Sequence, residues 1–234
     1  EFNALDFSHL KHTISGGMAL TEAAASTWQN VTGCQIQEAY GLTETSPAVS
    51  FNPYRDIRIG TIGKVVTGTQ VKVISEDGTD LGFDQEGELC VKGPQVMAGY
   101  WQRPEATAQV LDADGWFKTG DVAILAEDGF IRLVDRIKDM INVSGFNVYP
   151  NEIDDIASQH SGILECAAVG IPNSVSGETV KLFVVKSDSN LTADDVISHC
   201  REHLTAYKVP KEVEFRDDLP KTNVGKILRR ALRE

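Results

Sequence analysis

One segment in the second half of the chain combines charged side chains with tight turns, as binding sites for small polar ligands do. It runs from Asp114 to Pro150 and reads DGWFKTGDVAILAEDGFIRLVDRIKDMINVSGFNVYP. Its apolar alternation predicts two short β-hairpins on either side of the pair Asp135 and Arg136. Asp121 stands at a strand start, where a carboxylate can accept two hydrogen bonds from a ribose diol. An Asx turn, which Asp forms readily, is the structural alternative.

A second candidate loop reads Tyr40-Gly41-Leu42-Thr43-Glu44 and follows a predicted strand over residues 34–39. Its residue types suit a nucleotide, because a ring can lie against a base, a hydroxyl can bind phosphate and a carboxylate can hold Mg²⁺. A turn that carries an ordinary solvated glutamate explains the same residues. The loop alone therefore leaves both interpretations open.

Two further segments suggest a moving part. Asp135 and Arg136 lie where one strand pattern gives way to another, so they form either a weak surface ion pair or a polar link on which one domain swings. Gly145, in the segment SGFN, either relieves a left-handed turn or lets a thin, flexible ligand pass close to the backbone.

A lysine near the C-terminus is the last candidate. Lys226 ends the segment PKTNVGK, at the start of a predicted final helix from Val224. A cation is slightly disfavoured at a helix N-terminus, which hints at function: a mobile ammonium can neutralise a carboxylate and a phosphate as they react. An ordinary surface lysine is the alternative. The segment is not a Walker loop, because Pro220 replaces the first glycine and no Ser or Thr follows the lysine.

Composition narrows the class of protein. The 234 residues carry a formal net charge of −12, which argues against a general nucleic-acid binder, although the region 201–234 is rich in cations. No apolar run approaches the roughly 18 residues of a membrane span. The four cysteines form no Cys-x-x-Cys pair, which indicates reduced thiols in a cytoplasmic protein.

One pair of histidines fits a metal-binding pattern. His199 and His203 fit H-x-x-E-H, a zinc-protease pattern that puts both rings on one face of a helix. No third ligand is apparent, so we expect no zinc. We also expect both rings on the solvent flank of the helix, because its buried positions are Val196, Ile197, Cys200 and Leu204.

Three parts must position these residues. Residues 1–56 are predicted to end an α/β subdomain, with a helix over 18–32 that Thr21 caps. Residues 57–134 carry short strands separated by EDG, QEG, KGP and ADG turns, which predicts a small β-barrel-like subdomain interrupted by a brief helix over 104–110.

Residues 135–234 read as a compact α+β domain, large enough to fold alone. Its predicted helices follow Pro150, Thr192 and Val224, and its predicted strands include 163–169 and 180–185. The expected fold class is thus mixed α/β and α+β.

The order of the motifs resembles one superfamily, the acyl-adenylate-forming enzymes, which include acyl-CoA synthetases, luciferases and peptide-synthetase adenylation domains. The resemblance covers essentially the whole chain and corresponds to the C-terminal half of those enzymes. Its segments are SGGMAL, QEAYGLTETSP, GYWQRPEAT, DGWFKTGD, VDRIKDMINVSGFNVYPNEID and PKTNVGKILRR. The details SGFNVYPNEI and NPYRDIRIGTIGKVV are similar to bacterial long-chain fatty acyl-CoA ligases.

The resemblance implies a two-step reaction. A fatty acid and ATP, with Mg²⁺, give acyl-AMP and pyrophosphate, and the thiol of coenzyme A then displaces AMP. The implied nucleotide-binding residues are Gly17, Tyr40 near adenine, Gly41, Thr43 on phosphate, and Asp121 and Arg136 on the ribose. Glu44 would hold Mg²⁺. Asp135 would be the hinge, Lys226 would bridge the carboxylate and the α-phosphate, and the Gly145 loop would then reach the CoA arm.

The chain departs from the family's pattern in two places. Ala19 occupies the place where many members carry Pro, and nothing in the chain resembles the family's phosphate loop with its lysine. We therefore expect a fragment of an active ligase that is inactive alone. A ligase for another carboxylate, medium-chain or aryl, and a non-catalytic nucleotide-binding module remain the alternatives. A homodimer and a peripheral association with the inner membrane are compatible with the resemblance.

Overall fold

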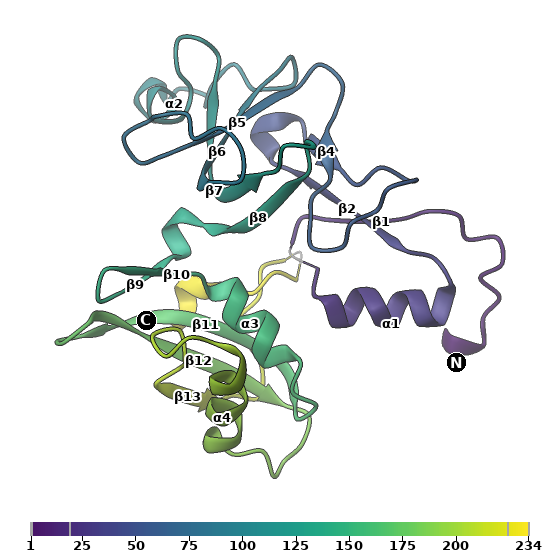
Figure 1. Cartoon of the computed structure of the whole chain (residues 1–234), viewed down its shortest axis with the longest axis vertical. Coiled ribbons are helices and arrows are strands. Elements are labelled where there is room, and N and C mark those ends of the chain that lie inside the picture. Colours follow the sequence, from purple (N-terminus) through teal and green to yellow (C-terminus); the bar gives the residue numbers. More distant parts are fainter. Residues whose placement is uncertain (1, 19, 224, 234) are drawn as a thin grey trace. The chain divides into compact units, whose positions relative to one another are not determined.

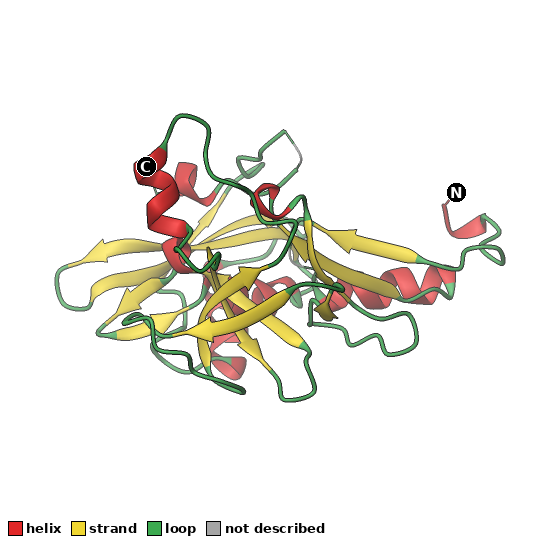
Figure 2. Ribbon diagram, turned by 90° about the horizontal axis from the view of Figure 1, so that it is seen from above, coloured by secondary structure: helices red, strands yellow, loops and turns green. Residues whose placement is uncertain are grey.

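The computed structural model describes residues 2–18, 20–223 and 225–233. The chain divides into two compact units, residues 1–134 and residues 135–234, and each is described by itself. Strands dominate the secondary structure of both units (Figures 1 and 2). Ala19, whose identity departs from the family motif, lies outside the described residues.

The first part of unit 1 is a helix next to a four-stranded sheet. Its elements are β1 (Thr13–Gly16), α1 (Glu22–Thr32), β2 (Ile36–Gly41), β3 (Ala48–Phe51) and β4 (Lys64–Val65), with 3-10 turns at Phe2–Ala4 and Thr43–Thr45. The sheet order is β1-β2-β3-β4, with β1 parallel to β2 and the other pairs antiparallel. Thr21 caps α1 as predicted, since its hydroxyl accepts a hydrogen bond from Ala24 N at 3.3 Å.

The second part of unit 1 is an antiparallel sheet in the order β5-β6-β7-β8. Its elements are β5 (Gln70–Ile74), β6 (Glu86–Lys92), α2 (Pro104–Val110), β7 (Phe117–Leu125) and β8 (Ile131–Arg136). Val49, Leu89, Ala123 and Ile131 belong to one buried cluster, so β3 of the first sheet shares a core with this one. The sequence led us to expect a barrel-like form, but in the described residues the sheet stays open, with β5 and β8 at its edges.

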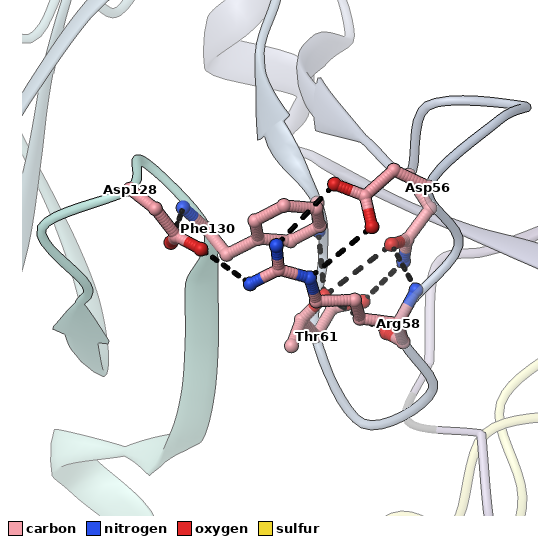
Figure 3. A network of polar contacts seen from close by, with 7 residues as sticks. Asp56, Arg58, Thr61, Asp128 and Phe130 are labelled. Atoms are coloured by element: carbon pink, nitrogen blue, oxygen red, sulfur yellow. Dashed lines mark hydrogen bonds and ion pairs between the residues drawn. The ribbon is translucent and has the colours of Figure 1, made fainter.

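A polar network ties the loop before β4 to the turn between β7 and β8 (Figure 3). The Arg58 guanidinium pairs with Asp56 and Asp128, and it lies 3.6 Å from the centre of the Phe130 ring. These ion pairs are exposed, so they add little stability. The fully buried Asn52 holds the backbone of this loop, because its side chain accepts from Arg58 N at 2.9 Å and donates to Thr61 O at 2.6 Å.

Unit 2 is a five-stranded sheet covered on both faces. Its elements are β9 (Ile141–Val143), β10 (Phe146–Val148), α3 (Pro150–Ser158), β11 (Ile163–Asn173), β12 (Gly177–Lys186), α4 (Ala193–His203) and β13 (Glu212–Phe215), with 3-10 turns at Ile137–Asp139 and Arg229–Leu232. The order is β10-β9-β12-β11, and β13 also pairs with β12 in parallel.

The alternation of side chains along β11 and β12 builds two cores. Ala168 and Leu182 face one cluster, which includes Ile153 of α3 and Val196 of α4. The neighbouring positions, such as Phe183, face a second cluster. Three residues from the C-terminal segment complete this second cluster: Leu219, Ile227 and Leu232. The segment that carries Lys226 is thus fastened to the sheet on both sides of the lysine.

The C-terminal segment does not form the predicted helix. Val224 lies outside the described residues, but Lys221 pairs with Ile227 as an isolated bridge, and the only helical turn in residues 225–233 is Arg229–Leu232. Gly225 has φ +83°, which an α-helix does not allow. Lys226 therefore sits in a tight hairpin, and the argument from a helix dipole does not apply to it.

Of the helices in the described part of the chain, none combines the length and apolar character needed to cross a membrane.

Candidate active site

Tyr40 and Asp121 are brought together in unit 1. Tyr40 lies at the end of β2 and Asp121 lies in β7, and the Tyr40 hydroxyl donates to Asp121 Oδ2 at 2.5 Å. Asp121 is only 5% exposed, and the Tyr40 ring packs against the shared core of unit 1. Two of the residues predicted to hold adenosine therefore form one contact although they are 81 positions apart in the sequence.

The turn before Asp121 is held by its neighbours. The Thr119 hydroxyl accepts from Asp121 N at 3.1 Å and donates to Leu89 O at 2.8 Å. Gly120 has φ +72°, and its N–H donates to a Glu88 carboxylate oxygen at 3.0 Å. The backbone around Asp121 is thus fixed to β6, which fixes the position of the carboxylate.

The loop after Tyr40 folds tightly for a local reason. A Cβ at Gly41 would lie 1.7 Å from Pro47 O, so only glycine fits where the two strand ends approach. Thr45 N donates to Leu42 O at 3.0 Å, which closes a 3-10 turn, and the buried Thr45 hydroxyl accepts from Leu42 N at 3.0 Å. Thr43 stands exposed on this turn and Glu44 is half-buried.

Glu44 is held by a residue that sequence reasoning missed. The Tyr100 hydroxyl donates to Glu44 Oε1 at 2.9 Å, and Met97 N donates to Glu44 O at 2.8 Å. Burial, followed by the hydrogen bond to Glu44, raises the pKa of the Tyr100 phenol. The available signal was the segment GYWQRPEAT, to which sequence reasoning assigned no role.

Gly17, also predicted to bind nucleotide, follows β1 in unit 1. It has φ +90° and is exposed. The turn therefore needs glycine for its backbone conformation.

Asp135 is the first residue of unit 2 and lies near the end of β8, which crosses the boundary between the units. Its carboxylate accepts from Arg136 N at 2.7 Å and from Asn151 N, in the first turn of α3, at 2.8 Å. The side chain is 5% exposed, and burial raises the pKa of Asp135 against the lowering effect of these two donors. A carboxylate at a helix N-terminus is favourable, so Asp135 anchors the start of the unit to α3. Arg136, the residue predicted to reach the ribose, is exposed.

Gly145 lies at the tip of the hairpin between β9 and β10. Ser144 has φ +55° and Gly145 has φ +87°, the two positive values of a type I′ turn. Gly145 N donates to the Asn142 side chain at 2.9 Å, and no atom lies within 4 Å of a Cβ built on Gly145. The glycine is therefore needed for its backbone angle, and the space beside it is open within unit 2.

The Lys226 ammonium is exposed on its hairpin. Thr222 N donates to Lys226 O at 2.7 Å, and Lys226 N donates to the Thr222 hydroxyl at 3.1 Å. Across the described ranges, no residue forms a hydrogen bond or ion pair with Lys226 Nζ. Lys221, on the same hairpin, is in contrast paired with Glu165 at 2.8 Å. The backbone of Lys226 is thus fixed, while its ammonium has no hydrogen-bond or ion-pair partner in the described ranges.

We expected the rings of His199 and His203 to face solvent, and this is only partly the case. His199 is half-buried and its Nε2 lies 2.9 Å from Ile156 O, whereas His203 is exposed. The His160 and His203 rings both lie edge-on to the His199 ring. Within the described residues, no group of three or more His, Cys, Asp or Glu is arranged to hold a metal. A single carboxylate such as Glu44 still suits Mg²⁺, which commonly takes one or two carboxylates together with substrate phosphates.

Two family matches cover most of the chain in order. Residues 1–101 match the family described as AMP-binding enzyme, and residues 152–226 match its partner, AMP-binding enzyme C-terminal domain. The chain belongs to this family of acyl-adenylate-forming enzymes. Within the family it is similar to bacterial long-chain-fatty-acid–CoA ligases, at 57% identity to that of Salmonella typhimurium and 43% to that of Bacillus subtilis.

Both alignments cover 100% of this chain and 42% of the relative, so the chain spans less than half the length of these proteins. The feruloyl-CoA synthase of an Amycolatopsis species is 39% identical over 99% of this chain and 48% of its own length.

Solved structures show the same fold. MatB from Rhodopseudomonas palustris with ATP bound superposes with a TM-score of 0.90 at 35% identity, over 95% of this chain and 45% of that one. The anthranilate CoA ligase AuaEII, in complex with anthranoyl-AMP, gives a TM-score of 0.90 at 31% identity, over 99% of this chain and 46% of that one.

Proposed function

We propose that this chain is the C-terminal part of an ATP-dependent long-chain fatty acid:CoA ligase. The observation that carries the proposal is the 57% identity to a long-chain-fatty-acid–CoA ligase across the whole chain. The contact between Tyr40 and Asp121 and the uncommitted ammonium of Lys226 support it. In the first reaction a fatty carboxylate attacks the α-phosphorus of ATP and pyrophosphate leaves; in the second the CoA thiol attacks the acyl carbonyl and AMP leaves.

The residues of unit 1 would bind the nucleotide. The Tyr40 ring lies beside adenine, Asp121 accepts from the ribose hydroxyls and Thr43 donates to a phosphate. Gly17 and Gly41 let the backbone turn close to the ligand. Glu44 would hold Mg²⁺, which shields the charge of the phosphates when it is bound with ATP.

The residues of unit 2 would act in turn. Lys226 places its ammonium between the fatty carboxylate and the α-phosphate, where it stabilises the charge that develops as the two react. Arg136 binds the ribose. Residues 135–234 would then swing as a mobile domain about Asp135, so that the Gly145 turn comes to line the path of the CoA arm. Residues 1–56 and 57–134 would be two subdomains of the larger domain that stays in place.

A ligase for an aryl acid is the second candidate, because the chain is 39% identical to a feruloyl-CoA synthase. The experiment that separates the two uses the purified full-length protein that contains this chain. Acyl-CoA and AMP formation are measured with octanoate, palmitate, oleate, ferulate and anthranilate. We expect palmitate and oleate to react fastest, with ATP, Mg²⁺ and CoA all required. A clear preference for ferulate or anthranilate would contradict the proposal.

Two controls sharpen the result. We expect the 234-residue chain alone to form no acyl-CoA, so activity of the isolated chain would contradict its dependence on the rest of the ligase. A homodimer, cytoplasmic location and peripheral association with the inner membrane belong to the same proposal. The solution mass of the full-length protein tests the homodimer, its sedimentation with anionic lipid vesicles tests the membrane association, and cell fractionation tests the location.

A further inference from the structure

The segment from Met97 to Thr107 holds Glu44 at two points. Met97 N donates to Glu44 O, which fixes the backbone, and the Tyr100 hydroxyl donates to Glu44 Oε1. The two side chains are 56 positions apart in the sequence, and both belong to unit 1. Among the described residues, the bond from Tyr100 is the one hydrogen bond found on the Glu44 carboxylate.

Tyr100 is itself fixed by the residues of its motif. The Thr107 hydroxyl accepts from Tyr100 N at 2.9 Å and donates to Arg103 O at 2.9 Å. Arg103 N donates back to Tyr100 O at 3.1 Å. Gly99 has φ +147°, and a Cβ there would lie 2.8 Å from Thr107 Cγ2. The segment thus closes on the first turns of α2 and presents the phenol in one direction.

Packing does not explain this orientation. Tyr100 is 36% exposed, and its neighbour Trp101 is 87% exposed. Tyr100 is not among the residues of the buried cluster of unit 1 or those packed against it, so the hydrogen bond to Glu44 is the directional contact that orients its hydroxyl.

We propose that Tyr100 is a positioning residue, which orients the Glu44 carboxylate toward a magnesium–nucleotide ligand. The proposal rests on the proposed function, which assigns Mg²⁺ to Glu44. With one carboxylate oxygen occupied by the phenol, the carboxylate cannot rotate freely, and the other oxygen stays available to the cation. Hydrogen bonds of this kind, made to a ligating carboxylate, typically change metal affinity by roughly 10–100-fold.

The contact is tested first on this chain, without nucleotide. The five tyrosines are replaced biosynthetically by 3-fluorotyrosine, and Tyr100→Phe identifies the Tyr100 resonance in the ¹⁹F spectrum. We expect Glu44→Gln to shift that resonance, because the charge of the acceptor is lost. A Tyr100 resonance that does not respond to Glu44→Gln overturns the proposal.

The function is tested on the full-length protein that contains this chain, with Mn²⁺ as the probe. Binding of Mn²⁺–ATP is followed by electron paramagnetic resonance, and the Mg²⁺ dependence of AMP formation is followed in parallel. We expect Tyr100→Phe to weaken Mn²⁺–ATP binding and to raise the Mg²⁺ needed for half-maximal rate, both by roughly 10-fold or more. The matched control is Tyr54→Phe, which removes a hydroxyl from another exposed tyrosine of unit 1 and should change neither.

The outcomes separate the two claims. If Glu44→Gln impairs Mn²⁺–ATP binding while Tyr100→Phe behaves as the parent protein, the proposed function stands and the positioning role is overturned. If the parent protein forms AMP but Glu44→Gln leaves Mn²⁺–ATP binding unchanged, Glu44 is not a ligand and the positioning role falls with it. A parent protein that neither binds Mn²⁺–ATP nor forms AMP overturns both.

Discussion

Breaking the ion pair between Arg229 and Asp154 should loosen unit 2 alone. Arg229 Nη2 donates to Asp154 Oδ2 at 2.5 Å and to Asn151 Oδ1 at 2.8 Å, and the two paired side chains are only 19% and 18% exposed. Asp154 Oδ1 also accepts from Ala168 N at 2.7 Å, so the pair links the C-terminal segment to α3 and β11. The substitution Arg229→Met keeps the length of the side chain and removes its charge.

The magnitude follows from burial. Removing one partner of a buried pair costs about 3–5 kcal/mol, because the other charge is left without compensation. Both side chains keep a little contact with water, so we expect the lower end, about 3 kcal/mol. That corresponds to a roughly 150-fold rise in the open fraction of unit 2.

The cysteines provide the assay. The structure places the four free thiols in the interior, with Cys34 and Cys90 in unit 1 and Cys166 and Cys200 in unit 2. Pulsed thiol labelling at about pH 8 over a urea series, read by peptide mass spectrometry, reports the opening of each unit in one sample. Arg229→Met should expose the second pair at lower urea and leave the first pair unchanged.

Two variants serve as controls. Lys221→Met breaks a more exposed pair on the same segment and should cost at most about 1 kcal/mol. Arg229→Met combined with Asp154→Leu removes the stranded carboxylate and should recover part of the loss. Unchanged protection of Cys166 and Cys200 in Arg229→Met would refute the reasoning, as would equal exposure of all four thiols.

Three further outcomes are expected. The first is measured by urea unfolding followed by circular dichroism, because protonated thiols label poorly below pH 7, and the other two by the same labelling assay. Burial raises the pKa of Asp154 to about 7 from an ordinary 3.8, so folded unit 2 retains a proton that the unfolded chain releases. Its stability should therefore fall as the pH rises from about 4 to about 7, and Asp154→Asn should abolish that fall; an unchanged pH profile in Asp154→Asn would be evidence against it. Thr192→Ala removes the hydroxyl that caps α4 and should destabilise unit 2 by about 1 kcal/mol, whereas a loss confined to unit 1 would contradict the cap. Leu89→Ala should destabilise unit 1 by about 2–5 kcal/mol, because Leu89 is fully buried; protection of Cys90 at the parent urea concentration would contradict this.

Local signals predicted the helices well. The helix over Pro104–Val110 has the bounds that the sequence indicated, and α3 begins at Pro150, because proline is favoured in the first turn. α4 follows Thr192, which forms a capping box with Asp195. Each of these signals depends on residues within one turn of the helix end.

Features set by distant contacts were less predictable. Barrel closure depends on whether edge strands meet, which turn spacing does not encode, and the sheet stays open in the described residues. The sequence predicted a final helix from Val224, but Gly225 and the pairing of Lys221 with Ile227 give a hairpin instead.

In the candidate site, too, local motifs were predictable from the sequence and contacts between distant residues were not. Motif order made Tyr40 and Asp121 candidates for the site, but only the structure shows that the Tyr40 hydroxyl donates to the Asp121 carboxylate. Tyr100 was missed because its hydrogen-bond partner, Glu44, is 56 positions away in the sequence. The spacing of residues within one motif carries no information about such a partner.

The most direct test of the account is the effect of Lys226→Ala on each half-reaction proposed for the full-length protein. Fatty-acid-dependent exchange of pyrophosphate into ATP reports adenylation, and conversion of supplied acyl-AMP with CoA reports thioester formation. We expect the exchange to fall by roughly 10²–10³-fold, as when one preorganised charge-stabilising donor is removed. Thioester formation should stay within a few-fold of the parent rate, and Lys221→Ala on the same hairpin should retain both. Exchange at the parent rate in Lys226→Ala would contradict the account.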